Sequence, residues 1–254
     1  MKLVSLFFKG IILSALLLGG CVSVPVEQRV AEDPWQGYNR AMFKFNAGLD
    51  KAVLKPAAKG YRWVLPDFVE RGISNFFSNL GDVPNSLNNL LQGKFKAAGG
   101  DSIRFLMNST FGIAGFFDVA SSTGLEKHNE DFGQTLGVWG VPSGPYLMLP
   151  LLGPSSVRDS GGFLVDLAMR PQSYIDDDEV RWGLYAIELV SARNSVLKLE
   201  ESAGLGIYDD YEQMREVYLQ RRKSLIANGH LDDDAAADDD ALRKELEALE
   251  GLEE

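Results

Sequence analysis

The chain has 254 residues, of which 45% are hydrophobic and 24% are charged. This length corresponds to one large or two small domains, and the composition excludes both a disordered chain and a membrane protein with many spans. The net charge of −11 argues against nucleic acid as a partner, because a phosphate backbone attracts lysine and arginine. With one cysteine and two histidines, the sequence has no internal disulfide and no His/Cys cage for zinc.

Residues 1–20 have the pattern of a secretory signal peptide, with two lysines, an apolar run and small residues at its end. The run closes with Leu18-Gly19-Gly20-Cys21, which resembles a bacterial lipobox, in which the cysteine receives diacylglycerol before cleavage. We therefore expect the mature protein to begin at Cys21, to carry an N-acyl diacylglycerol group there, and to be held at a membrane by its acyl chains. The alternative is an uncleaved anchor, but the run is shorter than the roughly 18 residues that a span needs.

The residue after the cysteine is Val22, at a position where lipoproteins retained in the inner membrane of enteric-type bacteria commonly carry aspartate. This likeness predicts sorting to the outer membrane, with the protein facing the periplasm. Residues 21–32 have no helical apolar period and are predicted to form a lipidated tether between the membrane and the folded body.

The first predicted element of the body is an amphipathic helix. Asp33 is expected to be its N-cap and Pro34 its first helical residue. Large apolar side chains then recur every three or four positions and form one face, at Trp35, Tyr38, Met42, Phe45 and Leu49. That face either packs in a protein core or, given the lipid anchor, lies in a membrane.

Helical periodicity continues through the next fifty residues. A short element is expected between Gly60 and Pro66, followed by a helix over 67–80. Asp82-Val83-Pro84 is expected to interrupt that helix, which resumes over 85–91. A third helix is predicted through residues 103–107.

The most informative segment is the uncharged stretch 132–157. Its length would suit a transmembrane helix, but its repeated glycines and prolines would break a helix and leave backbone groups unpaired in lipid. We therefore expect irregular chain that is covered by protein or lines a cavity. A buried loop in a globular core and a lipid-contacting lining both remain possible from the residues alone.

The carboxyl-terminal part returns to helices. The carboxylates at 176–179 precede an apolar period and suit a helix N-terminus, with metal binding as the alternative. A last body helix is predicted over 209–227, ending at Asn228-Gly229. Residues 232–254 carry a net charge of −9 and are predicted to be an acidic, largely disordered tail, with a docking role as the alternative. The signal peptide contributes +2, which leaves −4 for the body.

The sequence holds no familiar catalytic motif. A GxSxG elbow, a phosphate loop and a dinucleotide fingerprint are all missing. His128, close to Glu126, Glu130 and Asp131, is the candidate general base or metal ligand, and a solvated histidine in a charged loop is the simpler interpretation. We therefore predict no enzyme activity, no metal and no cofactor beyond the covalent lipid at Cys21.

Several segments in a fixed order across the body, residues 33–231, form a distinctive pattern. They are Asp33-Pro34-Trp35-Gln36-Gly37-Tyr38-Asn39-Arg40, Leu91-Gln92-Gly93, Asp131-Phe132-Gly133-Gln134-Thr135-Leu136-Gly137, Gly144-Pro145-Tyr146 with Pro150, and Arg158-Asp159. This pattern resembles the MlaA (VacJ) family of outer-membrane lipoproteins. The acidic tail departs from the family's enteric pattern.

The resemblance implies a mainly α, single-domain ring of amphipathic helices around a central amphipathic channel. The ring would lie in the membrane plane, in the inner leaflet of the outer membrane, bound to a trimeric porin. Misplaced phospholipids would leave the outer leaflet through the channel and pass to a periplasmic carrier, MlaC, so that lipid asymmetry is maintained.

Within that picture, we predict Phe45 and Asn46 as channel-wall residues where a perturbation changes gating. The predicted channel lining is Tyr146, Leu147, Met148 and Leu149. Two other functional classes remain as alternatives: a structural lipoprotein that braces porins, and a lipid-modifying enzyme that uses His128.

Overall fold

The computed structural model describes residues 33–204 and 206–227. The predicted signal peptide 1–20, the tether 21–32 with Cys21, the helix stop at Asn228-Gly229 and the tail 232–254 lie outside the described residues. The described chain is mainly helical, which confirms the predicted fold class.

The chain begins with one continuous helical rod, in which the π-helical turn η2 (Asp50–Leu54) joins α2 (Gln36–Leu49) to α3 (Lys55–Val64). Strands β1 (Tyr146–Leu149) and β2 (Gly153–Ser156) form an antiparallel hairpin. The remaining elements are α4 (Asp67–Leu91), α5 (Phe95–Thr110), η3 (Ser121–Thr123), α6 (Phe132–Val138), α7 (Val157–Met169), η4 (Pro171–Tyr174), α8 (Asp178–Ala203) and α9 (Tyr211–Ile226).

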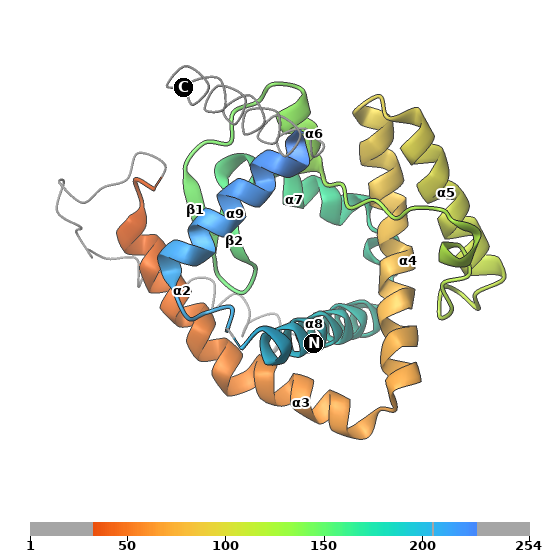
Figure 1. The fold of residues 1–254 in the computed structure, drawn as a ribbon, viewed down its shortest axis with the longest axis horizontal. Helices are drawn as coiled ribbons and strands as arrows, with labels where there is room; N and C mark the ends of the chain where they lie inside the picture. The colour runs from red at the N-terminus through yellow and green to blue at the C-terminus, as the bar shows by residue number, and fades with distance from the viewer. Residues whose placement is uncertain (1–32, 205, 228–254) are drawn as a thin grey trace, which may run out of the picture.

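The elements contact one another in a closed circuit (Figure 1). Helix α2 packs on β1, β2 on α9, α9 on α6, α6 on α4, α4 on α8, and α8 on α3, which continues into α2 through η2. Helix α5 packs along the outer side of α4. The helices therefore follow one another around a ring, in keeping with the arrangement that the resemblance implies.

Polar side chains dominate the packing of this circuit. Among the described residues, the buried polar side chains outnumber the buried apolar ones, and many are asparagines on helices, at positions 39, 46, 79, 85, 88, 89, 108 and 194. Large apolar side chains instead lie on the outside, where Trp63 is 88% exposed and Phe111 is 74% exposed. Water-soluble proteins normally show the reverse distribution, and an exposed apolar surface of this extent marks contact with lipid or another protein.

Within the described part of the chain, no helix combines the length and the apolar character that crossing a membrane requires.

Buried ion pairs connect the elements of the ring. Arg193 of α8 donates from Nε and Nη2 to the two carboxylate oxygens of Asp50, at 2.6 and 2.9 Å, and from Nη2 to Glu200 at 3.1 Å. Arg104 of α5 donates to both carboxylate oxygens of Asp118, at 3.0 and 3.1 Å. Because an unpaired buried charge is costly, each cation fixes the positions of its partners.

Asp33 does not cap the first helix, contrary to the prediction. The helix begins at Gln36, its N-cap position is Trp35, and no side chain caps it. The Asp33 carboxylate is fully buried and instead accepts hydrogen bonds from Asn39 and Tyr211. The Asp33 carboxylate therefore accepts hydrogen bonds from these side chains and not from the free amides at the start of the helix.

Of the two roles predicted for the stripe on the first helix, packing in a protein core was mostly wrong, and contact with a membrane stays a prediction. The buried side of α2 consists of Gln36, Asn39, Met42 and Asn46, whereas Trp35 is 45% exposed. Of the predicted aromatic and apolar stripe, only Met42 is fully buried, so the core side of this helix is chiefly polar.

The predicted breaks in the second helical region were also wrong. Helix α4 runs unbroken through Pro84, and Gly60 lies inside α3. A proline removes one helical hydrogen bond, but a long helix held by neighbours tolerates that loss. Here Asp82, just before the proline, is buried and paired with Lys127, so tertiary contacts hold the helix across this turn.

The uncharged stretch 132–157 is not irregular, contrary to the prediction, since it contains α6 and the hairpin. Glycines at its turns adopt positive φ, as at Gly144 (φ 67°) and Gly153 (φ 85°). The glycines and prolines that exclude a membrane helix therefore mark turns between short elements.

The other predicted helices are confirmed. Helix α5 contains residues 103–107, and α9 begins within two residues of the predicted start. The carboxylate run starts α8, where the Asp177 side chain accepts from the amides of Glu179 and Val180. No cluster of three or more potential metal ligands exists among the described residues.

The ion pairs of Arg193 allow a stability test. Arg193→Met should lower the free energy of unfolding by about 3 to 5 kcal/mol, because it leaves Asp50 buried without its cation and leaves Glu200 with only the more distant Lys55. The measurement is denaturant unfolding in detergent. In the control Arg181→Met, which breaks the more exposed pair with Asp178, the loss should be about 1 kcal/mol or less. Equal losses in both variants would contradict the prediction.

Candidate functional site at the hairpin and the α9 junction

Asn39 of α2 binds the backbone of strand β1. Its Nδ2 donates to the carbonyl oxygen of Tyr146 at 3.0 Å, and its Oδ1 accepts from the amide of Met148 at 2.8 Å. One amide side chain thus supplies a donor and an acceptor, as a neighbouring strand would. Asn39 is fully buried, so both bonds are shielded from water.

Asn46, two helical turns later, repeats this arrangement at the hairpin turn. Its Nδ2 donates to the carbonyl oxygen of Leu149 and its Oδ1 accepts from the amide of Leu151, both at 2.9 Å. Leu151 has a φ of 68°, in the left-handed region that disfavours a residue with a side chain. Asn46 therefore holds a strained turn in place.

The structure brings the predicted site residues together at this junction. Tyr146 and Met148 are fully buried, whereas Leu147 and Leu149 alternate with them and are half-buried, as is Phe45. The predicted wall and lining residues therefore meet, and their roles remain predictions. Sequence reasoning missed Asn39, although its spacing of seven from Asn46 on one helix face was a usable signal.

Asp33 joins this junction to α9. Its carboxylate accepts from Asn39 Nδ2 at 2.7 Å and from the Tyr211 hydroxyl at 2.6 Å, and Arg215 lies 3.4 Å away. Burial and the hydrogen bond to Asp33 raise the pKa of Tyr211 well above its usual value. The first described residue is therefore fixed by donors from α2 and α9.

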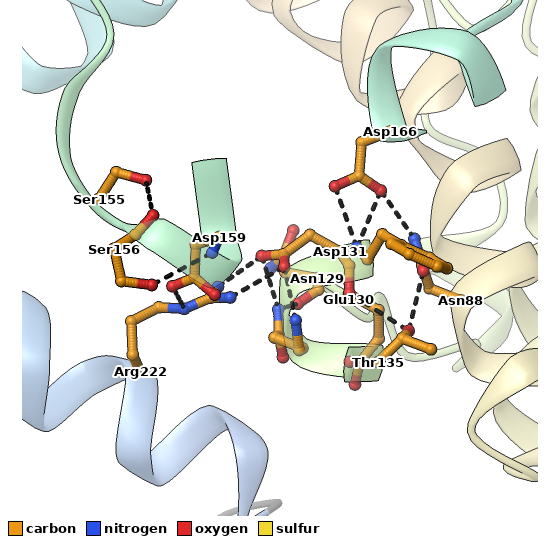
Figure 2. A network of polar contacts seen from close by, with 12 residues as sticks. Asn88, Asn129, Glu130, Asp131, Thr135, Ser155, Ser156, Asp159, Asp166 and Arg222 are labelled. Atoms are coloured by element: carbon orange, nitrogen blue, oxygen red, sulfur yellow. Dashed lines mark hydrogen bonds and ion pairs between the residues drawn. The ribbon is translucent and has the colours of Figure 1, made fainter. Parts of the chain in front are cut away.

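A second polar network joins α6, α7 and α9 (Figure 2). Asp131, the N-cap of α6, accepts from Gln134 and from Arg222 of α9, with Nη2 of Arg222 at 2.9 Å. Arg222 also pairs with Asp159 of α7 at 2.8 Å. Burial would raise the pKa of Asp131, but the hydrogen bonds and charge of Arg222, with the bonds from Gln134, lower it.

The same network extends to α4 (Figure 2). Asp166 of α7 accepts from the Phe132 amide at 2.9 Å and from Asn88 at 3.0 Å, and Thr135 donates to Asn88. Gly162 permits this approach, because a Cβ there would lie 2.5 Å from the backbone nitrogen of Gly133. Close packing of α6 on α7 therefore requires glycine.

A pocket of about 320 Å³ opens beside this network. Its walls come from α4, the segment before α6, α6 itself and α9, and most of the lining residues are polar or charged types. The lining residues are Asn85, Asn129, Glu130, Asp131, Gln134, Tyr218, Arg221, Arg222 and Leu225.

His128 lies in the loop before α6 and is partly exposed, as the simpler interpretation expected, but its ring is held by a buried partner. Its Nδ1 lies 2.9 Å from Oδ1 of the fully buried Asp101, which also accepts from Asn89. Among the described residues, no serine, threonine or cysteine side chain is hydrogen-bonded to His128. The pair therefore joins α5 to the segment before α6, and the arrangement includes no nucleophile.

The junction of Asn46 with the hairpin gives one prediction. Asn46→Leu leaves the Leu149 carbonyl and the Leu151 amide without partners, at a cost of about 1 to 3 kcal/mol each. We expect the Leu151 amide to exchange its hydrogen at least about tenfold faster, as measured by hydrogen–deuterium exchange. The control Asn75→Leu, which breaks a side-chain bond to the Phe116 carbonyl, should leave Leu151 unchanged. Unaltered exchange at the Leu151 amide in Asn46→Leu would contradict the conclusion that Asn46 holds the hairpin turn in place.

The lowered pKa of Asp131 gives a pH prediction. A depressed carboxyl pKa stabilises the fold above the ordinary value of 3.8, and this stabilisation is lost as pH falls through the lower value in the folded protein. Asp131→Asn should therefore be less stable at pH 7 and lose less stability than the wild type on acidification below pH 4. Denaturant unfolding at several pH values gives the free energy of unfolding of the wild type and the variant as a function of pH. Asp67→Asn, an exposed control, should keep the pH dependence of the wild type.

Comparison with known proteins identifies the family. The model of the MlaA lipoprotein family matches residues 31–225. The intermembrane phospholipid transport system lipoprotein MlaA of Escherichia coli (strain K12) is 35% identical over 232 residues, covering 85% of this chain and 89% of the relative. The protein of the same name from Haemophilus influenzae is 34% identical over 245 residues, covering 93% and 96%.

The fold is similar as well. A solved structure that concerns maintenance of bacterial outer membrane lipid asymmetry is 34% identical and superposes with a TM-score of 0.66. The match covers 76% of this chain and 98% of that chain. With the family model matching most of its length, the chain belongs to the MlaA lipoprotein family.

Proposed function

We propose that this protein removes mislocalised phospholipids from the outer leaflet of the outer membrane and passes them to a periplasmic lipid carrier. It would thereby maintain lipid asymmetry, as a member of an intermembrane phospholipid transport system. The names of its relatives, and the subject of the similar solved structure, support this proposal.

The observation that carries the proposal is the inverted distribution of side chains. Buried asparagines and ion pairs fill the contacts between helices, while Trp63, Phe95 and Phe111 are more than two-thirds exposed. Acyl chains require an apolar surface, and a phospholipid headgroup requires polar partners along its path. The exposed apolar side chains offer such a surface to acyl chains, and the buried polar contacts hold the helices in the ring through which a headgroup would pass.

We propose that the ring lies in the membrane plane, in the inner leaflet of the outer membrane, and faces the periplasm. Acyl groups on Cys21 would hold it there, since two or more chains give stable anchoring. The closed circuit of helices, with apolar side chains around it, supports this placement. The amphipathic channel would then run through the ring.

At that channel, we propose Phe45 and Asn46 as wall residues and strand 146–149 as lining, with Leu147 and Leu149 toward the channel and the fully buried Tyr146 and Met148 packed behind them. The contacts of Asn46 with Leu149 and Leu151 support a coupling between α2 and the hairpin, so a change in either would alter the other. Half-buried Leu147 and Leu149 would contact acyl chains.

The proposed partners follow from the same picture. They are membrane phospholipids, a trimeric outer-membrane porin and a periplasmic carrier similar to MlaC. We propose that the protein binds no nucleic acid and needs no cofactor beyond its covalent lipid. As a transport lipoprotein it would perform no chemistry on the lipid, which agrees with the lack of a nucleophile at His128.

Gene deletion tests this function. A strain without the gene should accumulate phospholipid in the outer leaflet and become sensitive to detergent, and the wild-type gene should restore both properties. Unchanged outer-leaflet phospholipid and detergent resistance after deletion would contradict the proposal. The measurement is enzymatic labelling of surface phospholipid, together with growth in detergent.

Two variants separate the alternatives in that strain. Phe45→Asp, which places a charge at the proposed wall, should still co-purify with porin yet fail to restore asymmetry, whereas a brace would remain functional. His128→Asn keeps a donor for Asp101 and should restore asymmetry fully. An enzyme would be favoured if His128→Asn did not restore asymmetry and if the purified wild type, but not this variant, released fatty acid from vesicles.

A further inference from the structure

The rod formed by α2, η2 and α3 has a charge opposite to that of the protein. The whole chain has a net charge of −11, and the rod contains one acidic residue, the buried Asp50. Its basic residues recur at helical spacing along the rod, at Arg40, Lys44, Lys51, Lys55, Lys59 and Arg62. A positive stripe therefore runs along one element of an acidic protein.

Half of this stripe is used in internal ion pairs. Lys55 pairs with Glu200 and Arg62 pairs with Glu201, both on α8. Arg40 pairs with Glu212 at the start of α9. These pairs attach the rod to its neighbours in the ring.

The other half forms no ion pair. Lys44, Lys51 and Lys59 are exposed, and among the described residues none of them forms an ion pair. The pKa of Glu201 on α8 is lowered first by Arg62 and also by the charge of Lys59, so Lys59 lies near a carboxylate without pairing with it. The three lysines are seven and eight residues apart, about two helical turns each, so exposed cations follow one another along the rod.

Exposed apolar side chains accompany these lysines. Val53 is 52% exposed, Trp63 is 88% exposed and Val64 is 66% exposed. A helix that carries both exposed apolar side chains and exposed lysines suits a membrane interface, because the apolar side chains can enter the acyl boundary while the lysine ammonium groups reach the headgroups.

We propose that the rod 36–64 is a binding surface for anionic phospholipid headgroups, with Lys44, Lys51 and Lys59 contacting their phosphates. The inference rests on the proposed membrane function and adds a preference for lipid charge. An anionic membrane surface fits because it presents many headgroup phosphates in one plane, so several lysines along a helix can each bind one. It also supplies acyl chains for the exposed apolar residues, whereas an acidic protein surface would supply only the negative charge.

The test measures which lipids surround the protein. The full-length lipidated protein is reconstituted in phosphatidylcholine vesicles that contain spin-labelled phosphatidylglycerol or spin-labelled phosphatidylcholine, and electron paramagnetic resonance gives the immobilised fraction of each. We expect the wild type to prefer phosphatidylglycerol by about fivefold or more, which corresponds to the attraction of one lysine to an anionic surface. High salt should reduce that preference, since screening weakens surface electrostatics.

Matched variants assign the preference to the rod. The triple variant Lys44→Gln, Lys51→Gln, Lys59→Gln should lose the preference. A control with the same charge change at exposed cations on α4, α5 and α9, Arg71→Gln, Lys96→Gln, Lys223→Gln, should keep it. A preference that persists in the rod variant, or that the control loses equally, would overturn the inference.

Failure of the inference is distinguishable from failure of the proposed function. If the wild type immobilises lipid without preferring phosphatidylglycerol, only the inference is wrong, and an acidic protein becomes the better partner for the rod. If it immobilises no lipid of either kind, the membrane-embedded function is wrong as well. Both variants should keep the wild-type circular dichroism, because the substituted side chains are exposed.

Discussion

A polar group removed from water needs a hydrogen-bond partner, and the ring depends on this requirement. An apolar core can be filled by many combinations of side chains, whereas each buried amide or charge here needs a partner of complementary polarity at a fixed position. Asn39 and Asn46 hydrogen-bond to the hairpin backbone, and Arg193 pairs with Asp50. Specific pairing therefore sets the geometry that hydrophobic packing sets in other proteins.

This requirement also explains how a thin ring can hold its shape. Only a small apolar cluster exists among the described residues, where Met42, Tyr146, Met148 and Tyr211 meet between α2, the hairpin and α9. Elsewhere the contacts between elements rely on directional bonds, as at Asp131 and Arg222 in Figure 2. Such bonds fix the angles between helices as well as the distances between them, which a closed circuit of elements requires.

The parts of the fold that depend on local chemistry could be predicted from the sequence. The run of carboxylates predicted the start of α8, where Asp177 accepts from amides of its own helix. The apolar period predicted α9, whose N-cap Asp210 was not predicted. The errors at Asp33 and Pro84 have one cause, because contacts with residues distant in the sequence determine the local structure at both positions. At the candidate site, the meeting of Asn46 with 146–149 was predicted only through family resemblance, and the pairing of Asn39 was predictable from polar residues at helical spacing.

The burial of Asp33 limits how far the body can stand from its proposed acyl anchor. Asp33 lies twelve positions after Cys21, and a fully extended chain of that length spans about 40 Å. That length is about the thickness of a bilayer with its headgroups. Because Asp33 is hydrogen-bonded to both α2 and α9, the proposed tether would join the ring where the first and last described helices meet, so the anchor would orient the ring as well as retain it.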